Sequence, residues 1–152
     1  MSAKMIAERK DVPDEHKWVL TPLFETDEAW EQLFSEVDRA LDRYGDYRGR
    51  LKESARFFKE AIEFHLGLTR RIERLYTYAH LKSDEDKSDQ FYLGLHQRAL
   101  NVHTRASEMA SFMTPEIQSM PDKIVSRYLA DESLGEYKFY LKKILRYKPH
   151  TR

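Results

Sequence analysis

Six histidines are the residues of this chain best suited to bind a metal ion or to transfer a proton. They are His16, His65, His80, His96, His103 and His150. A helical zinc-peptidase site needs His-Glu-x-x-His, because two imidazoles four residues apart reach one ion with the glutamate beside its bound water. No histidine pair has that spacing, and none has the Glu-x-x-His pattern of di-iron bundles. We therefore predict no catalytic, cofactor-binding or metal-binding residue in this chain.

Other chemical motifs are incomplete or missing. The acidic stretch from Asp84 starts like a calcium-binding loop, but Asp89 stands where that loop needs glycine and Leu95 where it needs glutamate. This stretch is predicted to cap and solvate a turn. No glycine-rich phosphate loop and no Gly-x-Ser-x-Gly turn occurs. His65 falls on an apolar helical stripe, where we expect a hydrogen-bonded core histidine.

Two long amphipathic segments between Ser54 and Met113 dominate the chain, and Ser54 is a suitable N-cap for the first. Their apolar or weakly polar residues recur at steps of three and four, which places them on one helix face. The first set is Phe58, Ile62, His65, Thr69, Ile72, Tyr76 and Ala79, and the second is Tyr92, Leu95, Ala99, Val102, Ala106, Met109 and Met113. The polar residues 82–88 predict a short turn between two antiparallel helices.

Caps and glycines mark the ends of the other expected helices. Thr26 is a suitable N-cap for a helix that Gly45 and Gly49 end. Three shorter helices are expected, over residues 115–119, 121–130 and 134–147. Inside the long helices, Gly67 and Gly94 cost helix propensity and predict the close approach of a neighbouring helix or a slight bend.

The composition predicts an all-α protein. The chain has 152 residues, of which 41% are hydrophobic and only five are Gly and five Pro. We predict a helical bundle built on a long antiparallel hairpin, with an extended N-terminal arm at residues 12–24. Residues 1–10 are expected to be a flexible N-terminus, and residues 11–152 a single helical domain.

The charge balance and the absence of cysteine limit the partners. The chain has 26 Lys plus Arg and 26 Asp plus Glu, whereas nucleic-acid binders usually carry a basic surplus. Its densest basic cluster, Arg70 to Arg74, is interrupted by Glu73 and is expected to be a solvated face. Without cysteine, a signal peptide or a long apolar run, we expect a soluble cytoplasmic protein with no nucleic-acid or membrane partner.

Three stretches, taken in order and at their spacing, resemble the N-terminal region of oligoendopeptidase F, a zinc metallopeptidase of the thimet-oligopeptidase-like group. They are residues 18–24 (WVLTPLF) with 27–30 (DEAW), residues 75–86 (LYTYAHLKSDED), and residues 137–147 followed by Lys-Pro-His-Thr. The resemblance extends from about Arg9 to Thr151.

The resemblance implies a hydrolase that cleaves short peptides, with zinc held by His-Glu-x-x-His and a downstream glutamate in its C-terminal half. None of those positions exists in this chain, so we expect it to be inactive alone and to contain no cofactor. Its expected role is a cleft wall that docks on the catalytic half and admits short peptides. In the family pattern Leu-Ser and a further helix follow, whereas this sequence ends at Arg152, which predicts a fragment or an isolated domain. The alternative is a freestanding helical interaction module without enzymatic activity.

Overall fold

The computed structural model describes residues 24–147, and within them every regular element is a helix. In chain order they are α1 (Asp27–Ala40), the 3₁₀ helix η3 (Leu41–Arg43), α2 (Tyr44–Tyr47), α3 (Ala55–Glu85), α4 (Gln90–Ala110), α5 (Met113–Gln118), α6 (Asp122–Ala130), the 3₁₀ helix η4 (Glu132–Tyr137) and α7 (Lys138–Arg146). The predicted all-α class is confirmed. The expected flexible segment 1–10, the arm before Phe24, His16 and His150 lie outside the described residues.

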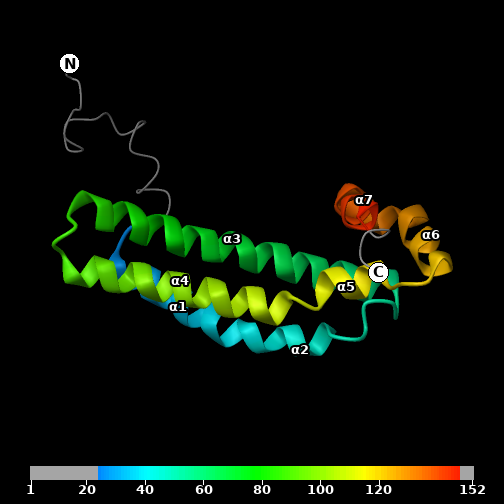
Figure 1. Ribbon diagram of the computed structural model, residues 1–152, viewed down its shortest axis with the longest axis horizontal. Helices are drawn as coiled ribbons and strands as arrows, with labels where there is room; N and C mark the ends of the chain where they lie inside the picture. The colour runs from blue at the N-terminus through cyan, green and yellow to red at the C-terminus, as the bar shows by residue number, and fades with distance from the viewer. Residues whose placement is uncertain (1–23, 148–152) are drawn as a thin grey trace, which may run out of the picture.

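α3 and α4 run antiparallel and form the long axis of the molecule (Figure 1). They have 31 and 21 residues, which corresponds to about 46 Å and 32 Å of helix. α1 and α2 lie along the side of this hairpin, whereas α5, α6 and α7 gather at the end opposite to the α3–α4 connection. The predicted antiparallel hairpin is therefore confirmed, and the shorter helices pack against its side and one end.

Both predicted caps of the longer helices are also confirmed. The hydroxyl of Thr26 accepts a hydrogen bond from the backbone N–H of Ala29 at 3.0 Å. The hydroxyl of Ser54 accepts one from the backbone N–H of Phe57, also at 3.0 Å. Each cap satisfies one of the backbone donors that a helix start leaves unpaired.

The predicted turn at residues 82–88 is wrong in its first half, which belongs to α3. Ser83 is buried, with 9% of its surface exposed. The ammonium group of Lys82 lies 5.7 Å from the ring centre of Tyr78 and 5.5 Å from that of Tyr92. The polarity of these residues predicted a turn. Instead, cation–π attraction and contact with α4 stabilise them as the last part of α3.

Four members of the predicted apolar stripe of α3 are buried, namely Phe58, Ile62, Ile72 and Ala79, but the buried face of the helix differs from the stripe at other positions. Leu68 and Leu75 are fully buried, whereas Thr69 is exposed and both His65 and Tyr76 are only half-buried. The buried face differs from the predicted stripe because α3 packs against α1 as well as α4 and so buries a wider face. The stripe of α4 is confirmed at its centre, where the buried residues are Leu95, Ala99, Val102 and Ala106.

Three other predicted helix ends differ from the structure. Gly45 lies inside α2, and the turn comes at Gly49, whose φ of 78° favours glycine. The helix expected at residues 115–119 begins two residues earlier. The first part of the helix expected at residues 134–147 is the 3₁₀ helix η4, which Asp131 caps with a hydrogen bond from the backbone N–H of the residue two positions on. A carboxylate that bonds this close to its own backbone favours a tight turn over an α-helical start.

The structure gives no packing reason for the two glycines inside the long helices. A Cβ atom added at Gly94 would meet nothing within 4 Å among the described residues, and one at Gly67 would meet only the guanidinium of Arg70 at 3.9 Å. The predicted close approach of a neighbouring helix is therefore wrong for the part of the chain that is described.

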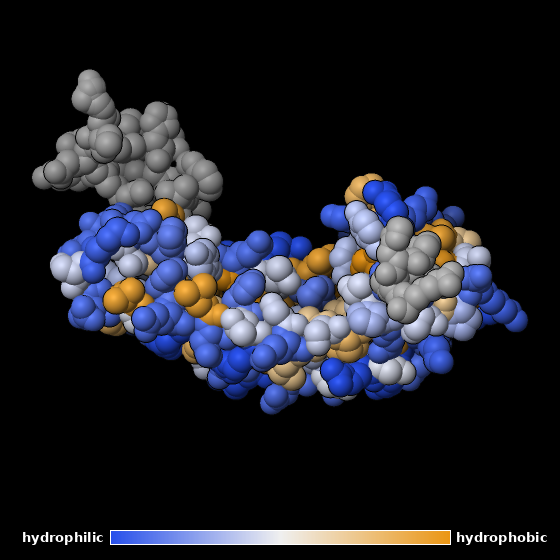
Figure 2. Space-filling model, viewed as in Figure 1, coloured by the Kyte–Doolittle hydropathy of each residue, from blue (hydrophilic) through white to orange (hydrophobic). Residues whose placement is uncertain are grey.

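Hydrophobic residues reach the surface in separate patches along the hairpin and again around α6 and α7 (Figure 2). Among the described residues, the large hydrophobic side chains with the greatest exposed fractions are Phe91 (52%), Leu100 (44%), Phe139 (73%) and Tyr147 (54%). Tyr140, on the same helix as Phe139, is half-buried. Within residues 24–147, no helix has both the length and the apolar character needed to span a bilayer.

Candidate functional site

Two adjoining hollows form a groove along the seam between α3 and α4, which we call the α3–α4 groove. The first, of about 640 Å³, is lined by Glu73, Tyr76, Thr77, Leu100 and His103. The second, of about 250 Å³, is lined by Tyr44, His65, Thr69, Ile72, His103, Ala106, Ser107 and Ala110. His103 lines both, so the two hollows adjoin at this residue. The size of the first is in the range of ligand-binding clefts.

Helical periodicity places this groove on the side of α4 that faces away from α1. Arg98 and Arg105 face α1, because their guanidinium groups pair with Glu31 and Asp38, each at 2.7 Å. At 100° per residue, His103 lies about 140° from Arg98 around the helix axis. The side chains that contact α1 and those that line the groove therefore come from different faces of the same helix.

One hydrogen-bonded network holds α1 in this position. The carboxylate of Asp27 accepts hydrogen bonds from the hydroxyls of Tyr78 at 2.7 Å and Tyr92 at 3.0 Å. Burial, followed by the bond to Asp27, raises the pKa of Tyr92 to about 12 and raises that of Tyr78 as well. The phenols thus stay protonated and keep donating. One carboxylate at the start of α1 is thereby joined to both helices of the hairpin.

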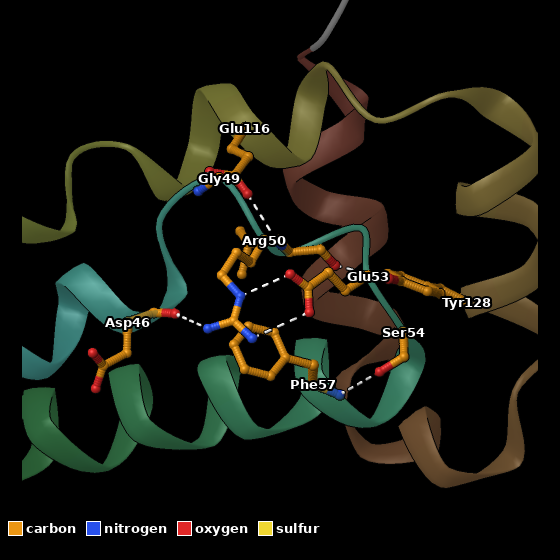
Figure 3. A network of polar contacts seen from close by, with 9 residues as sticks. Asp46, Gly49, Arg50, Glu53, Ser54, Phe57, Glu116 and Tyr128 are labelled. Carbon is orange, nitrogen blue, oxygen red and sulfur yellow. Dashed lines mark hydrogen bonds and ion pairs between the residues drawn. The ribbon is translucent and has the colours of Figure 1, made fainter.

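A second network holds the loop before α3 (Figure 3). The carboxylate of Glu116, on α5, accepts hydrogen bonds from the backbone N–H of Gly49 at 2.7 Å and of Leu51 at 2.9 Å. The hydroxyl of Tyr128, on α6, donates to the carbonyl of Leu51 at 2.7 Å. The loop that turns the chain into α3 is thus fixed by residues from the C-terminal helices.

At the α2 end of the groove, Tyr44 and His65 form a neutral polar pair. The Tyr44 hydroxyl and His65 Nδ1 are 2.8 Å apart, which confirms the predicted hydrogen bond, although His65 is half-buried and not a core residue. Burial raises the pKa of Tyr44 to about 12, with a smaller contribution from Tyr140, and burial lowers the pKa of His65. Both side chains therefore line the groove in their uncharged forms near neutral pH.

This pair predicts a loss of stability in mild acid. The folded-state pKa of His65 lies below its ordinary value of 6.5, so the unfolded chain binds more protons in that range. Its contribution to stability is complete above pH 6.5 and decreases as the pH falls towards the folded-state value. Urea unfolding at about pH 7.5 and about pH 5.5 should show a smaller difference for His65→Gln than for the original chain. Equal differences would show that His65 does not contribute.

Tyr76, which lines the groove, also belongs to a cluster of aromatic rings that could not be predicted from the sequence. Its ring is stacked 5.5 Å from His80 and lies 5.2 Å from His96, and the two imidazoles are 5.3 Å apart. His80 Nε2 is 3.2 Å from a carboxylate oxygen of Asp84, whereas His96 Nε2 is buried and has no hydrogen-bond partner in the described part of the chain. His80 and His96 lie close together because of the register between the antiparallel helices α3 and α4. The spacing of residues along one helix cannot predict this register.

These rings do not form a metal centre. Among residues 24–147, no three His, Cys, Asp or Glu side chains are grouped so that they could hold a metal ion. A catalytic zinc needs three protein ligands and an open position. The described residues therefore do not fit zinc.

The basic cluster of α3 is partly occupied by contacts within the protein. Arg71 Nε donates to the carbonyl of Gly67 at 3.3 Å, and the Arg74 guanidinium lies 5.1 Å from the ring centre of Phe24. Phe24 itself is buried against Tyr78, with ring centres 5.2 Å apart. Two of the three arginines of the cluster therefore make contacts within the protein.

Comparison with known proteins identifies the family. A family model described as "Oligopeptidase F" matches residues 116–152. Oligopeptidase PepF of Bacillus subtilis is 35% identical over 150 residues, which is 98% of this chain and 22% of that protein. Group B oligopeptidase PepB of Streptococcus agalactiae is 31% identical over 144 residues, which is 94% of this chain and 24% of that protein.

The folds agree as well. The crystal structure of oligoendopeptidase F from Enterococcus faecium matches with a TM-score of 0.74 and 30% identity over 84% of this chain and 25% of that one. A putative peptidase from Chlamydophila abortus, at 22% identity, shares the fold with a TM-score of 0.76 over 97% of this chain and 25% of that one. This chain thus spans about a quarter of the length of the proteins it matches. It belongs to the oligoendopeptidase F family of peptidases and corresponds to the N-terminal domain of that family.

Proposed function

We propose that this chain is the non-catalytic, cleft-forming N-terminal part of a cytoplasmic zinc peptidase that hydrolyses short peptides. The observation that carries this proposal is the match to oligopeptidases about four times longer, made by a scaffold whose described residues include no group of three metal ligands. The catalytic half is proposed to supply the zinc, which polarises the scissile carbonyl and activates water. This chain's own residues would shape and restrict the cleft.

We further propose that residues 11–152 form one helical domain. In the described part, a continuous hydrophobic core supports this proposal, since buried residues from α1 to α7 belong to one cluster. α1 is anchored by Trp30, α3 by Phe58 and α7 by Leu141, each at most 1% exposed. Such a core suits a unit that keeps its shape against a partner.

The outer face of α7 is the surface that we propose docks on the catalytic half. Phe139 is 73% exposed and Tyr147 54% exposed at the end of the described chain. The family model matches residues 116–152, a region that contains the end of α5 and all of α6 and α7. Exposed aromatic side chains are enriched at protein interfaces, so truncation of Phe139 should weaken docking without disturbing the core.

The test is co-expression with Bacillus subtilis PepF from which the matched N-terminal residues have been removed. We expect a one-to-one complex on size-exclusion chromatography that cleaves a quenched peptide. Phe139→Asp should weaken the complex, whereas Phe91→Asp, at the other end of the hairpin, should leave it intact. Two partners that elute separately and remain inactive would instead favour a freestanding interaction module.

A further inference from the structure

We propose that the α3–α4 groove binds a short extended peptide and places a basic side chain or free amino group of that peptide against Glu73. This inference rests on the proposed function and names the surface of this chain that would contact the peptide. The groove lies on the hairpin face turned away from α1, so binding there would not require α1 to move.

The length of the groove suits a peptide of only a few residues. On α4 its lining runs from Leu100 to Ala110, which is about 15 Å at 1.5 Å per residue. An extended chain advances about 3.3 Å per residue. About four or five residues would therefore fill it.

The lining chemistry favours a peptide over a helix from another domain. The first hollow combines the phenol of Tyr76, the hydroxyl of Thr77 and the imidazole of His103 with the apolar side chain of Leu100. Hydroxyl and imidazole groups can both donate to and accept from a peptide main chain. A buried interface core between domains would instead be mostly apolar. Leu100, 44% exposed, offers one apolar contact for a side chain.

The charge of the groove defines the class of peptide. Glu73 is the one formally charged residue among the described residues that line the two hollows. It forms no ion pair with any described residue. Among the neighbouring basic residues, Arg71 bonds back to the carbonyl of Gly67, and the Arg74 guanidinium lies 5.1 Å from the ring centre of Phe24. An arginine, a lysine or an α-ammonium group complements this carboxylate.

The test is an NMR titration of the ¹⁵N-labelled full chain with two capped pentapeptides that differ only at the central residue, Arg in one and Gln in the other. We expect saturable shift changes centred on residues 73–77 and 100–107. The Arg peptide should bind about two- to fivefold more tightly, as an exposed ion pair allows. Glu73→Gln should remove that preference, and Glu36→Gln, on the exposed face of α1, should not.

Three results would overturn the proposal. They are shift changes centred on α1 or α7, equal affinity for the two peptides, and no saturable change at millimolar peptide. Docking is read out separately, because Glu73→Gln leaves the α7 surface unchanged. A failed titration with an intact complex would therefore reject the groove and keep the proposed function.

Discussion

Replacement of Trp30 by alanine should destabilise the protein by about 3–5 kcal/mol, the range measured for large aromatic side chains removed from cores. Trp30 is fully buried where α1 meets α3, and its indole N–H donates to the carbonyl of Leu75 at 2.9 Å. Its ring stacks on Phe34 with centres 5.3 Å apart. Urea denaturation followed by circular dichroism measures the loss directly. Since small domains have a total stability of only about 5–15 kcal/mol, this loss is a large fraction of it. We expect the amides of α1 to lose hydrogen-exchange protection first.

Two further variants separate the causes. Trp30→Phe keeps most of the apolar area but removes the indole N–H, so its loss should be clearly smaller. Phe34→Ala removes the half-buried partner in the stack and should also cost less than Trp30→Ala. If Trp30→Ala unfolded at the same urea concentration as the original chain, Trp30 would not be the anchor of α1.

Replacement of Glu116 by alanine should cost about 2–3 kcal/mol, because it leaves two backbone donors without a charged acceptor. The donors are the N–H groups of Gly49 and Leu51, which reach the carboxylate at 2.7 and 2.9 Å (Figure 3). Leu51 is fully buried, and its carbonyl is held by Tyr128. The loss should appear in urea denaturation and as faster hydrogen exchange of those two amides.

The chain offers a matched control in the same network. Arg50 and Glu53 are paired at 2.7 Å with about half of each side chain exposed, and exposed pairs contribute little. Glu53→Gln should therefore leave the unfolding midpoint unchanged. Glu116→Gln keeps an acceptor oxygen but loses the charge, so its stability should lie between those of Glu116→Ala and Glu53→Gln. Equal stability of Glu116→Ala and Glu53→Gln would contradict the role assigned to Glu116.

Local signals predicted much of the fold. Thr26 and Ser54 cap the helices that they were expected to cap. The three- and four-residue spacing found the buried face of α4. These features succeed because a cap or a helix face depends on residues within a few positions of one another.

Features that depend on distant segments were missed. The end of α3 depends on Lys82 packing against a ring of α4, and its buried face depends on where α1 lies. Glu116 contacts residues 67 and 65 positions earlier in the chain. No motif marks such a contact in advance.

The candidate site could not be predicted from the sequence for the same reason. Tyr76 and His103 lie on different helices, and only the register between α3 and α4 brings them to one groove. The resemblance to a family of peptidases named the class of protein but no position in this chain. Spacing within a helix could test the histidines for metal motifs, yet it could not place His80 beside His96.

The most direct test of the central claim is a peptide-cleavage assay on the purified chain alone. The chain is incubated with zinc and an internally quenched short peptide, with and without a chelator. We expect no turnover above the buffer control, because the described residues contain no group of three metal ligands. Zinc-dependent turnover that the chelator abolishes would contradict the account of this chain as the non-catalytic part of a peptidase.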